Sequence, residues 1–374
     1  MNNNRNDSND DHFGLHLLRF GSVLLVIFGH WMLFSPSTSI ISSQVAPLFG
    51  FLGVEVLLVL CGFLIGKRVY ELLIESTSFP NSAVWGYLKR CAWRVLPLYY
   101  LVLLLVICTS MILGYTNSSI WKYFFFIQNF VSAMPPFFPE SWCVPIVFFG
   151  CVILVFSVGL LVKILPSISK STLFLSATVG ILLLSFLCKY LYYLHHGTIS
   201  LTEWDQNIKS VVMFRLDSFF VGVLFGWVYC SFPSFWINYR KQLFFVGILL
   251  MVFLFVGVGY FRFFIDSQPF FWEVLYLPLT SMAIAVTFPM VYQFRSNSIV
   301  GKKLLFFCDK ISLGMFLIHY SFVLLIFAHF ILISQTSVLI FYGLAVLYLA
   351  IVFLCSFVLH RFFEVPLLRW GTKN

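Results

Sequence analysis

The chain has 374 residues, of which 61% are hydrophobic and only 10% are charged. A soluble domain carries about 25% charged residues, so this composition excludes a soluble protein and indicates a polytopic membrane protein. The formal charge of +9 is explained by basic residues that flank membrane spans, so it does not call for nucleic acid as a partner. The nine cysteines show no CxxC pair and no metal-ligand spacing, so no metal is expected.

Polar residues occupy the first fourteen positions and lack the basic region that opens a secretory signal, so the first span is expected to be retained. Ten apolar segments follow, each about 18–24 residues long, the length that crosses a bilayer as a helix. They lie near 15–34, 48–66, 93–113, 143–165, 172–194, 211–230, 242–261, 270–291, 311–333 and 337–359. A further aromatic stretch at 120–131 is too short to span and is expected to be interfacial or re-entrant.

The sequence therefore predicts an all-α polytopic membrane bundle of about ten transmembrane helices. One domain at 15–366 lies between polar cytoplasmic tails at 1–14 and 367–374. The orientation follows from Lys and Arg, which favour cytoplasmic segments. With the N-terminus inside, Arg19 and Arg215 lie within spans and only four basic residues fall outside: Lys122, Lys189, Lys209 and Arg262. Both termini are thus predicted to be cytoplasmic.

The first span contains two ionisable side chains, Arg19 and His30, and such side chains within a bilayer are costly and commonly functional. Eleven residues make three helical turns and about 20° more, so the two share one face, about 16 Å apart along the axis. Arg19 is then near the cytosol and His30 lies in the outer half. His30 is a candidate general base; the alternative is a core histidine hydrogen-bonded to a neighbour.

Glu55 stands early in the second span, within the run from Gly53 to Ile65. A carboxylate there needs a partner, and His30 is a candidate because both lie toward the outer face of adjacent helices. A carboxylate bonded to one ring nitrogen fixes the histidine tautomer and raises the basicity of the other nitrogen. The alternative is that Glu55 only reaches the interface.

A basic cluster of Lys89, Arg90 and Arg94 marks the start of the third span. Arginines at a cytoplasmic helix start can bind phosphates through paired hydrogen bonds. Simple anchoring by positive charge is the alternative, and it explains Arg94 less well because Arg94 falls just inside the span.

Weaker candidates lie later in the chain. Arg215 and Asp217 at the start of the sixth span are explained by an internal salt bridge between them. The ninth span holds a second histidine, His319, and Glu364 lies near the C-terminus on the predicted cytoplasmic side. No phosphate-binding glycine loop, serine elbow or HExxH motif is present.

Taken in order, these segments resemble the acyltransferase 3 family, ten-helix integral membrane acyltransferases that modify bacterial surface glycans. The family opens with an Arg and a His eleven residues later, and it continues with a Gly-Val-Asp-x-Phe-Phe-x-x-Ser-Gly-Phe-Leu-Ile signature. The similar segments here are Arg19 with His30, Gly53 to Ile65, Arg94-Val-Leu-Pro97, Ser312 to His319, and Glu364-Val-Pro366. The resemblance covers nearly the whole chain.

The resemblance implies an O-acyltransferase, most often an O-acetyltransferase, that resides in the bacterial inner membrane among its lipids. The donor substrate would be cytosolic acetyl-CoA or another acyl-CoA, with no bound cofactor. The acceptor would be a hydroxyl of a surface polysaccharide, lipopolysaccharide or lipid-linked sugar. Our hypothesis assigns catalysis to His30 with Glu55, donor binding to Arg19, Arg90 and Arg94, and support to Arg215, His319 and Glu364.

Three positions depart from the family pattern. Cys91 stands where the family has an arginine, and Phe316 stands where tyrosine is common. Val147 stands where a glutamate is common, which leaves Glu140 as the nearest carboxylate. These changes suggest a divergent branch and leave a catalytically inactive relative open. The same intramembrane residues also suit transfer of succinyl or another acyl group, or a transporter or flippase for a lipid-linked or anionic substrate.

Overall fold

The structure, a computed structural model, describes residues 12–36, 46–76, 79–114, 119–197 and 200–371. Across these residues every regular element is a helix, and several contain π-helical turns. The elements are α1 (Phe13–Met32), α2 (Ala46–Glu75), α3 (Asn81–Ile112), α4 (Trp121–Phe124), η2 (Pro139–Trp142), α5 (Cys143–Ile164), α6 (Lys170–His195), α7 (Leu201–Trp204), η3 (Asp205–Lys209), α8 (Val212–Ser231), α9 (Pro233–Asn238), α10 (Arg240–Val252), η4 (Phe253–Gly257), α11 (Val258–Tyr260), η5 (Phe271–Leu275), α12 (Tyr276–Ala285), α13 (Phe288–Tyr292), α14 (Ile299–Ile318), η6 (His319–Leu324), α15 (Leu325–Phe330), η7 (Ile333–Gln335), α16 (Val338–Leu359), η8 (His360–Glu364) and α17 (Val365–Gly371).

Ten helical segments among the described residues are long and apolar enough to cross a membrane. Each overlaps one of the ten predicted spans, although the second and tenth extend further and the third begins twelve residues earlier, at Asn81. The all-α polytopic bundle is confirmed. The ninth helix starts earlier than its predicted span of 311–333, because α14 already begins at Ile299. The Ser298 side chain caps this start by accepting from the N–H of Gly301 at 3.1 Å. Asp309 therefore lies on the helix rather than in a loop.

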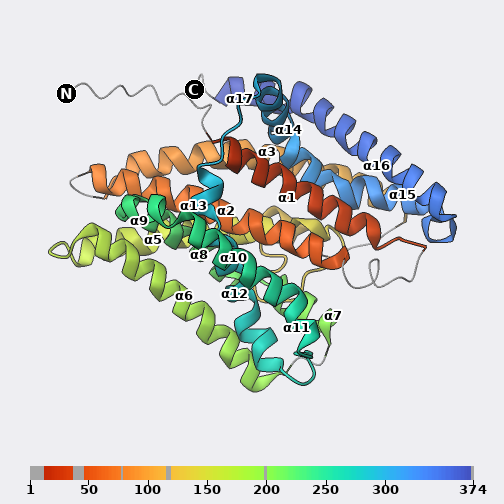
Figure 1. The fold of residues 1–374 in the computed structure, drawn as a ribbon. Coiled ribbons are helices and arrows are strands. Elements are labelled where there is room, and N and C mark those ends of the chain that lie inside the picture. The colour runs from red at the N-terminus through yellow and green to blue at the C-terminus, as the bar shows by residue number, and fades with distance from the viewer. Residues whose placement is uncertain (1–11, 37–45, 77–78, 115–118, 198–199, 372–374) are drawn as a thin grey trace.

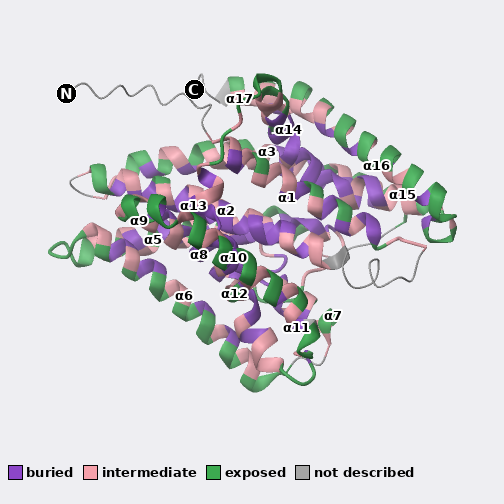
Figure 2. Ribbon diagram, viewed as in Figure 1, coloured by how far each residue is buried: buried purple, intermediate pink, exposed green. Residues whose placement is uncertain are grey.

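The helices differ in how much of their surface other helices cover (Figures 1 and 2). Buried residues concentrate on α2, α8, α12 and α14, which form the interior of the bundle. The helices α10 and α16 are mostly exposed along their length, and the exposed residues are largely Leu, Val, Ile and Phe. Those apolar faces suit contact with lipid tails.

Glycines bring α2 and α8 into very close contact. A Cβ atom added at Gly62 would lie 1.9 Å from the carbonyl oxygen of Phe219, and one added at Gly222 would lie 2.1 Å from that of Val59. Only glycine permits this approach, which is a common device between membrane helices. The contact fixes the register of the two helices and sets Glu55 on α2 beside Arg215 on α8.

The aromatic stretch 120–131 does not form a spanning helix. It contains the single turn α4 and then packs against the start of α8, where the carbonyl of Asn129 accepts from the N–H of Val212 at 2.9 Å. The Asn129 side chain donates to the carbonyls of Trp142 and Ser210. This stretch and the segment up to η2 are thereby held against the end of the bundle that contains His30.

Candidate active site

Two histidines from distant parts of the chain form a direct pair. His30 lies in the last turn of α1, and His319 opens the π-helical segment η6. Their Nδ1 and Nε2 atoms, respectively, are 2.9 Å apart. His319 is fully buried while His30 keeps some exposure, and the Tyr320 ring lies 4.8 Å from the His30 ring. The sequence analysis proposed His319 only as a supporting residue, whereas the structure places it in direct contact with His30.

The hydrogen-bond partners of this pair determine which nitrogen is free. The Nδ1 atom of His319 lies 2.6 Å from the carbonyl oxygen of Phe316, which can only accept, so Nδ1 carries the proton. In a neutral ring the Nε2 atom of His319 is then the acceptor, and His30 Nδ1 must donate to it. His30 Nε2 is left with its lone pair, which is the form a general base or nucleophile requires.

Neighbouring side chains hold the pair in place. The Tyr348 hydroxyl donates to the carbonyl of His319 at 3.1 Å. Trp31, next to His30, stacks between Phe341 and Tyr348 of α16 with ring centroids 5.1 and 5.0 Å away. The π-helical turn itself is a feature that often marks functional positions in helices. The pair is therefore built on packed helices, which favours a fixed geometry.

Arg19 has an acidic partner that the sequence analysis missed. Its Nη1 donates to Asp309 Oδ2 at 2.9 Å, and His16 Nδ1 lies 2.7 Å from the same oxygen. The Arg19 side chain remains 26% exposed. The Arg19–Asp309 and His30–His319 contacts advance together along α1 and along the helix formed by α14 and η6. These two helical segments therefore run parallel (Figure 1).

The predicted phosphate-binding arginines lie on the exposed surface of α3. Arg90 and Arg94 are both exposed, and Arg94 lines a small pocket with Pro97 and Glu364. Glu364 is also bonded to His360 Nδ1 at 2.6 Å, within η8. The predicted supporting residue Glu364 thus lies beside the arginine cluster and not beside His30.

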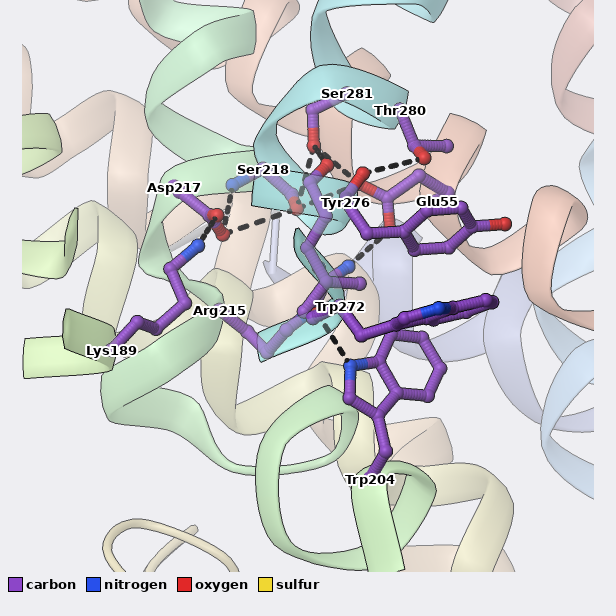
Figure 3. A network of polar contacts seen from close by, with 11 residues as sticks. Glu55, Lys189, Trp204, Arg215, Asp217, Ser218, Trp272, Tyr276, Thr280 and Ser281 are labelled. Atoms are coloured by element: carbon purple, nitrogen blue, oxygen red, sulfur yellow. Dashed lines mark hydrogen bonds and ion pairs between the residues drawn. The ribbon is translucent and has the colours of Figure 1, made fainter. Parts of the chain in front are cut away.

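Glu55 lies in a different buried cluster, so its predicted pairing with His30 is wrong. Its carboxylate accepts from Arg215 Nη2 and from the hydroxyls of Ser218 and Ser281, the Ser218 distance being 2.7 Å (Figure 3). Glu55 and Arg215 are both 0% exposed. The carboxylate and the guanidinium neutralise each other within the membrane.

The predicted salt bridge between Arg215 and Asp217 is also absent. Asp217 pairs instead with Lys189 of α6, a lysine that the charge pattern assigns to the outer side (Figure 3). Positions 215 and 217 are about 200° apart around a helix, so their side chains point to different neighbours. One faces α2 and the other faces α6. Ser218 joins the two pairs, because its N–H donates to Asp217 at 2.8 Å while its hydroxyl donates to Glu55.

The carboxylate of Glu140, in the short helix η2, bonds to the turn that carries His319. It accepts two hydrogen bonds from Ser321, which is two residues beyond His319. The sequence analysis noted Glu140 only as the carboxylate closest to the position of Val147.

Within the described residues, no group of three or more His, Cys, Asp or Glu side chains is arranged to hold a metal ion.

The fold and this site define a multi-pass membrane protein with a pair of contacting histidines near one end of its first helix. The family model for an acyltransferase domain, acyltransferase 3, matches residues 12–361. The chain therefore belongs to this family and is a membrane acyltransferase. No curated protein and no solved structure matches the chain.

Proposed function

We propose that this acyltransferase is an O-acetyltransferase of the bacterial inner membrane. In this proposal the donor is cytosolic acetyl-CoA, and the acceptor is a hydroxyl of a surface polysaccharide, lipopolysaccharide or lipid-linked glycan. The observation that carries the proposal is the contact between His30 and His319; with both rings neutral, the bond from His319 to the Phe316 carbonyl assigns the free lone pair of His30 to Nε2. The basic residues of the predicted cytoplasmic side support an anionic, phosphate-bearing donor.

The proposed reaction needs one base and one positioned thioester. His30 Nε2 takes the proton of the acceptor hydroxyl, whose oxygen attacks the thioester carbonyl carbon. The carbon–sulfur bond then breaks, the acyl group stays on the acceptor oxygen, and the departing thiolate takes the proton from the imidazolium. His319 accepts from His30 Nδ1 throughout and so keeps Nε2 directed at the reacting atoms. Transient transfer of the acyl group to Nε2 itself is the variant of this scheme, and trapping of a labelled acyl-enzyme distinguishes it.

The direct test uses the full chain purified in detergent with radiolabelled acetyl-CoA. Thioester cleavage, or label transfer to added glycan, supports the proposal. Succinyl-CoA in a parallel reaction tests the choice of acyl group. A protein that binds acetyl-CoA or glycan but never cleaves the thioester would instead fit a transporter or flippase. In cells, the O-acetyl content of surface glycan with and without the gene tests the acceptor class.

Arg94→Ala is expected to raise the KM for acetyl-CoA by roughly 10- to 100-fold and to leave kcat within about threefold. The reason is that a charge-assisted phosphate contact contributes equally to ground-state and transition-state binding. Initial rates over a range of acetyl-CoA concentrations measure this. Lys163→Ala, which removes an exposed charge from the same predicted side of the membrane, is the control. Loss of kcat with unchanged KM would contradict donor binding by Arg94.

His319→Phe is expected to lower kcat by roughly 10- to 100-fold, because His30 Nδ1 loses its acceptor and the ring loses its fixed tautomer. His319→Gln keeps a side-chain oxygen able to accept from His30 and is expected to recover most of that loss. Single-turnover rates at saturating acetyl-CoA compare the two variants. Equal rates in both would show that the His319 acceptor does not matter.

A further inference from the structure

A buried carboxylate with an unassigned role lies next to the histidine-bearing turn. Glu140 is 3% exposed, as is Ser321. Oε1 of Glu140 accepts from the backbone N–H of Ser321 at 2.8 Å, and Oε2 accepts from its hydroxyl at 2.5 Å. Both carboxylate oxygens thus bond to one residue, and that residue follows His319 by two positions.

The segment that carries Glu140 is itself anchored. The Ser141 hydroxyl donates to the carbonyl of Phe138 at 2.7 Å within η2, and Asn129 donates to the carbonyl of Trp142 at 2.9 Å. Helix α5 follows directly after Trp142. Glu140 is therefore presented by a held backbone, and its carboxylate can serve as a fixed point for the segment opposite.

The turn that receives Glu140 is irregular. The carbonyl of Phe316 lies five residues before Ser321, where a π-helical bond from the Ser321 N–H would be directed, and it accepts from the ring of His319. The Ser321 N–H meanwhile donates to Glu140. Two side-chain bonds therefore act on backbone groups of this one turn. A buried N–H left without an acceptor is costly, so the carboxylate stabilises the turn in this geometry.

We propose that Glu140 is a positioning residue that, through Ser321, fixes the His319 ring against His30. This inference rests on the proposed catalytic role of the histidine pair. Glu140 makes its two bonds to Ser321 and acts through the turn, so its effect is on the rate of the chemical step and not on donor binding. It supplies a carboxylate near the pair although Val147 stands at the position of the family glutamate.

The test compares Glu140→Ala with Glu140→Gln in the purified full chain. A glutamine amide can accept from the Ser321 N–H and donate to the Ser321 hydroxyl oxygen, so it preserves both contacts, whereas alanine removes both. Glu140→Ala is expected to lower kcat by roughly 10- to 100-fold, by analogy with the loss of a group that orients a metal-bound histidine. The KM for acetyl-CoA is expected to stay within about twofold, and Glu140→Gln is expected to restore kcat to within about threefold.

Double variants separate positioning from general destabilisation. Ser321→Ala added to Glu140→Ala is expected to cost nothing further, because the Ser321 hydroxyl has already lost its carboxylate acceptor. Thr178→Ala removes an equally buried hydroxyl, which donates to the carbonyl of Phe174 in α6, and is expected to leave kcat per folded enzyme unchanged. Unchanged kcat in Glu140→Ala, or equal losses in the Ala and Gln variants, would overturn the inference. Wild-type enzyme and His30→Ala in the same assay show separately whether the proposed function holds.

Discussion

Replacement of His30 by alanine is expected to lower the rate of acetyl transfer by about 10²- to 10⁴-fold, the range for loss of a general base. The expected loss is in kcat, because Arg19, one of the residues proposed to bind the donor, lies about 16 Å away from His30 along the axis of α1. His30 is only partly buried, and its ring contacts include the rings of His319 and Tyr320 and the backbone of Val26 but no carboxylate, so alanine leaves the bundle's charge pairs intact. Label transfer by matched amounts of folded enzyme measures the effect.

His329 provides the matched control for this variant. It lies in α15, is exposed, and follows the π-helical segment by about one turn. His329→Ala is expected to keep wild-type kcat and KM. The assignment of His30 as the base would be wrong if cells expressing only His30→Ala still acetylated their surface glycan fully. Gel filtration shows whether His30→Ala is folded, and only the folded fraction enters the rate comparison.

The sequence predicted the fold because the bilayer itself imposes the pattern. A spanning segment must satisfy its backbone polar groups internally, so length and hydropathy alone identify helices. The ninth span was placed too late because its first turns, from Ile299 to Lys310, include polar residues and lie before the apolar run. Asp309 was missed for the same reason. The apolar spacing of Leu305, Cys308 and Ile311, all buried, extends the helix face backwards and would have indicated it.

The candidate site was predicted in part. Helical periodicity predicts which residues of one helix share a face, but it does not predict which residues of other helices they contact. Arg19 and His30 share a face by helical periodicity, and the structure places Arg19 against α14 and His30 against η6, which continues from α14. Partners come from packing between helices distant in the chain. Glu55 pairs with a residue 160 positions away, and Glu140 bonds to one 181 positions away. The glycine contacts between α2 and α8 do have a sequence signal, because Gly62 and Gly66 on one helix and Gly222 and Gly226 on the other are each spaced by four residues. The π-helical turn has no such signal.

The Glu55–Arg215 pair has the features of a structural connection between helices. It joins α2 and α8, Ser281 adds α12, and Ser218 links the cluster to the Lys189–Asp217 pair (Figure 3). Each charge is compensated chiefly by its partner, because no solvent reaches either side chain. Removing one member therefore leaves the other charged and buried, which is far more costly than the pair is worth.

Arg215→Met is accordingly expected to lower the free energy of unfolding by about 3–5 kcal/mol, the cost of breaking a buried ion pair. The double variant Glu55→Leu with Arg215→Met replaces the pair by apolar side chains and is expected to be markedly more stable than Arg215→Met alone. Thermal unfolding of the purified protein in detergent measures this. Glu71→Gln, which disrupts the partly exposed contact with Arg68, is expected to change stability by less than about 1 kcal/mol.

The same double variant decides whether Glu55 takes part in catalysis, as the family resemblance implied. If Glu55 only connects helices, the folded double variant should keep kcat within about threefold of wild type. The reason is that the His30 ring bonds to His319, whereas the Glu55 carboxylate bonds to Arg215. If the double variant is stable but its kcat is reduced by about a hundredfold, Glu55 takes part in catalysis. Equal instability of the single and double variants would instead show that the cluster, through Ser218 and Lys189, depends on the charges themselves.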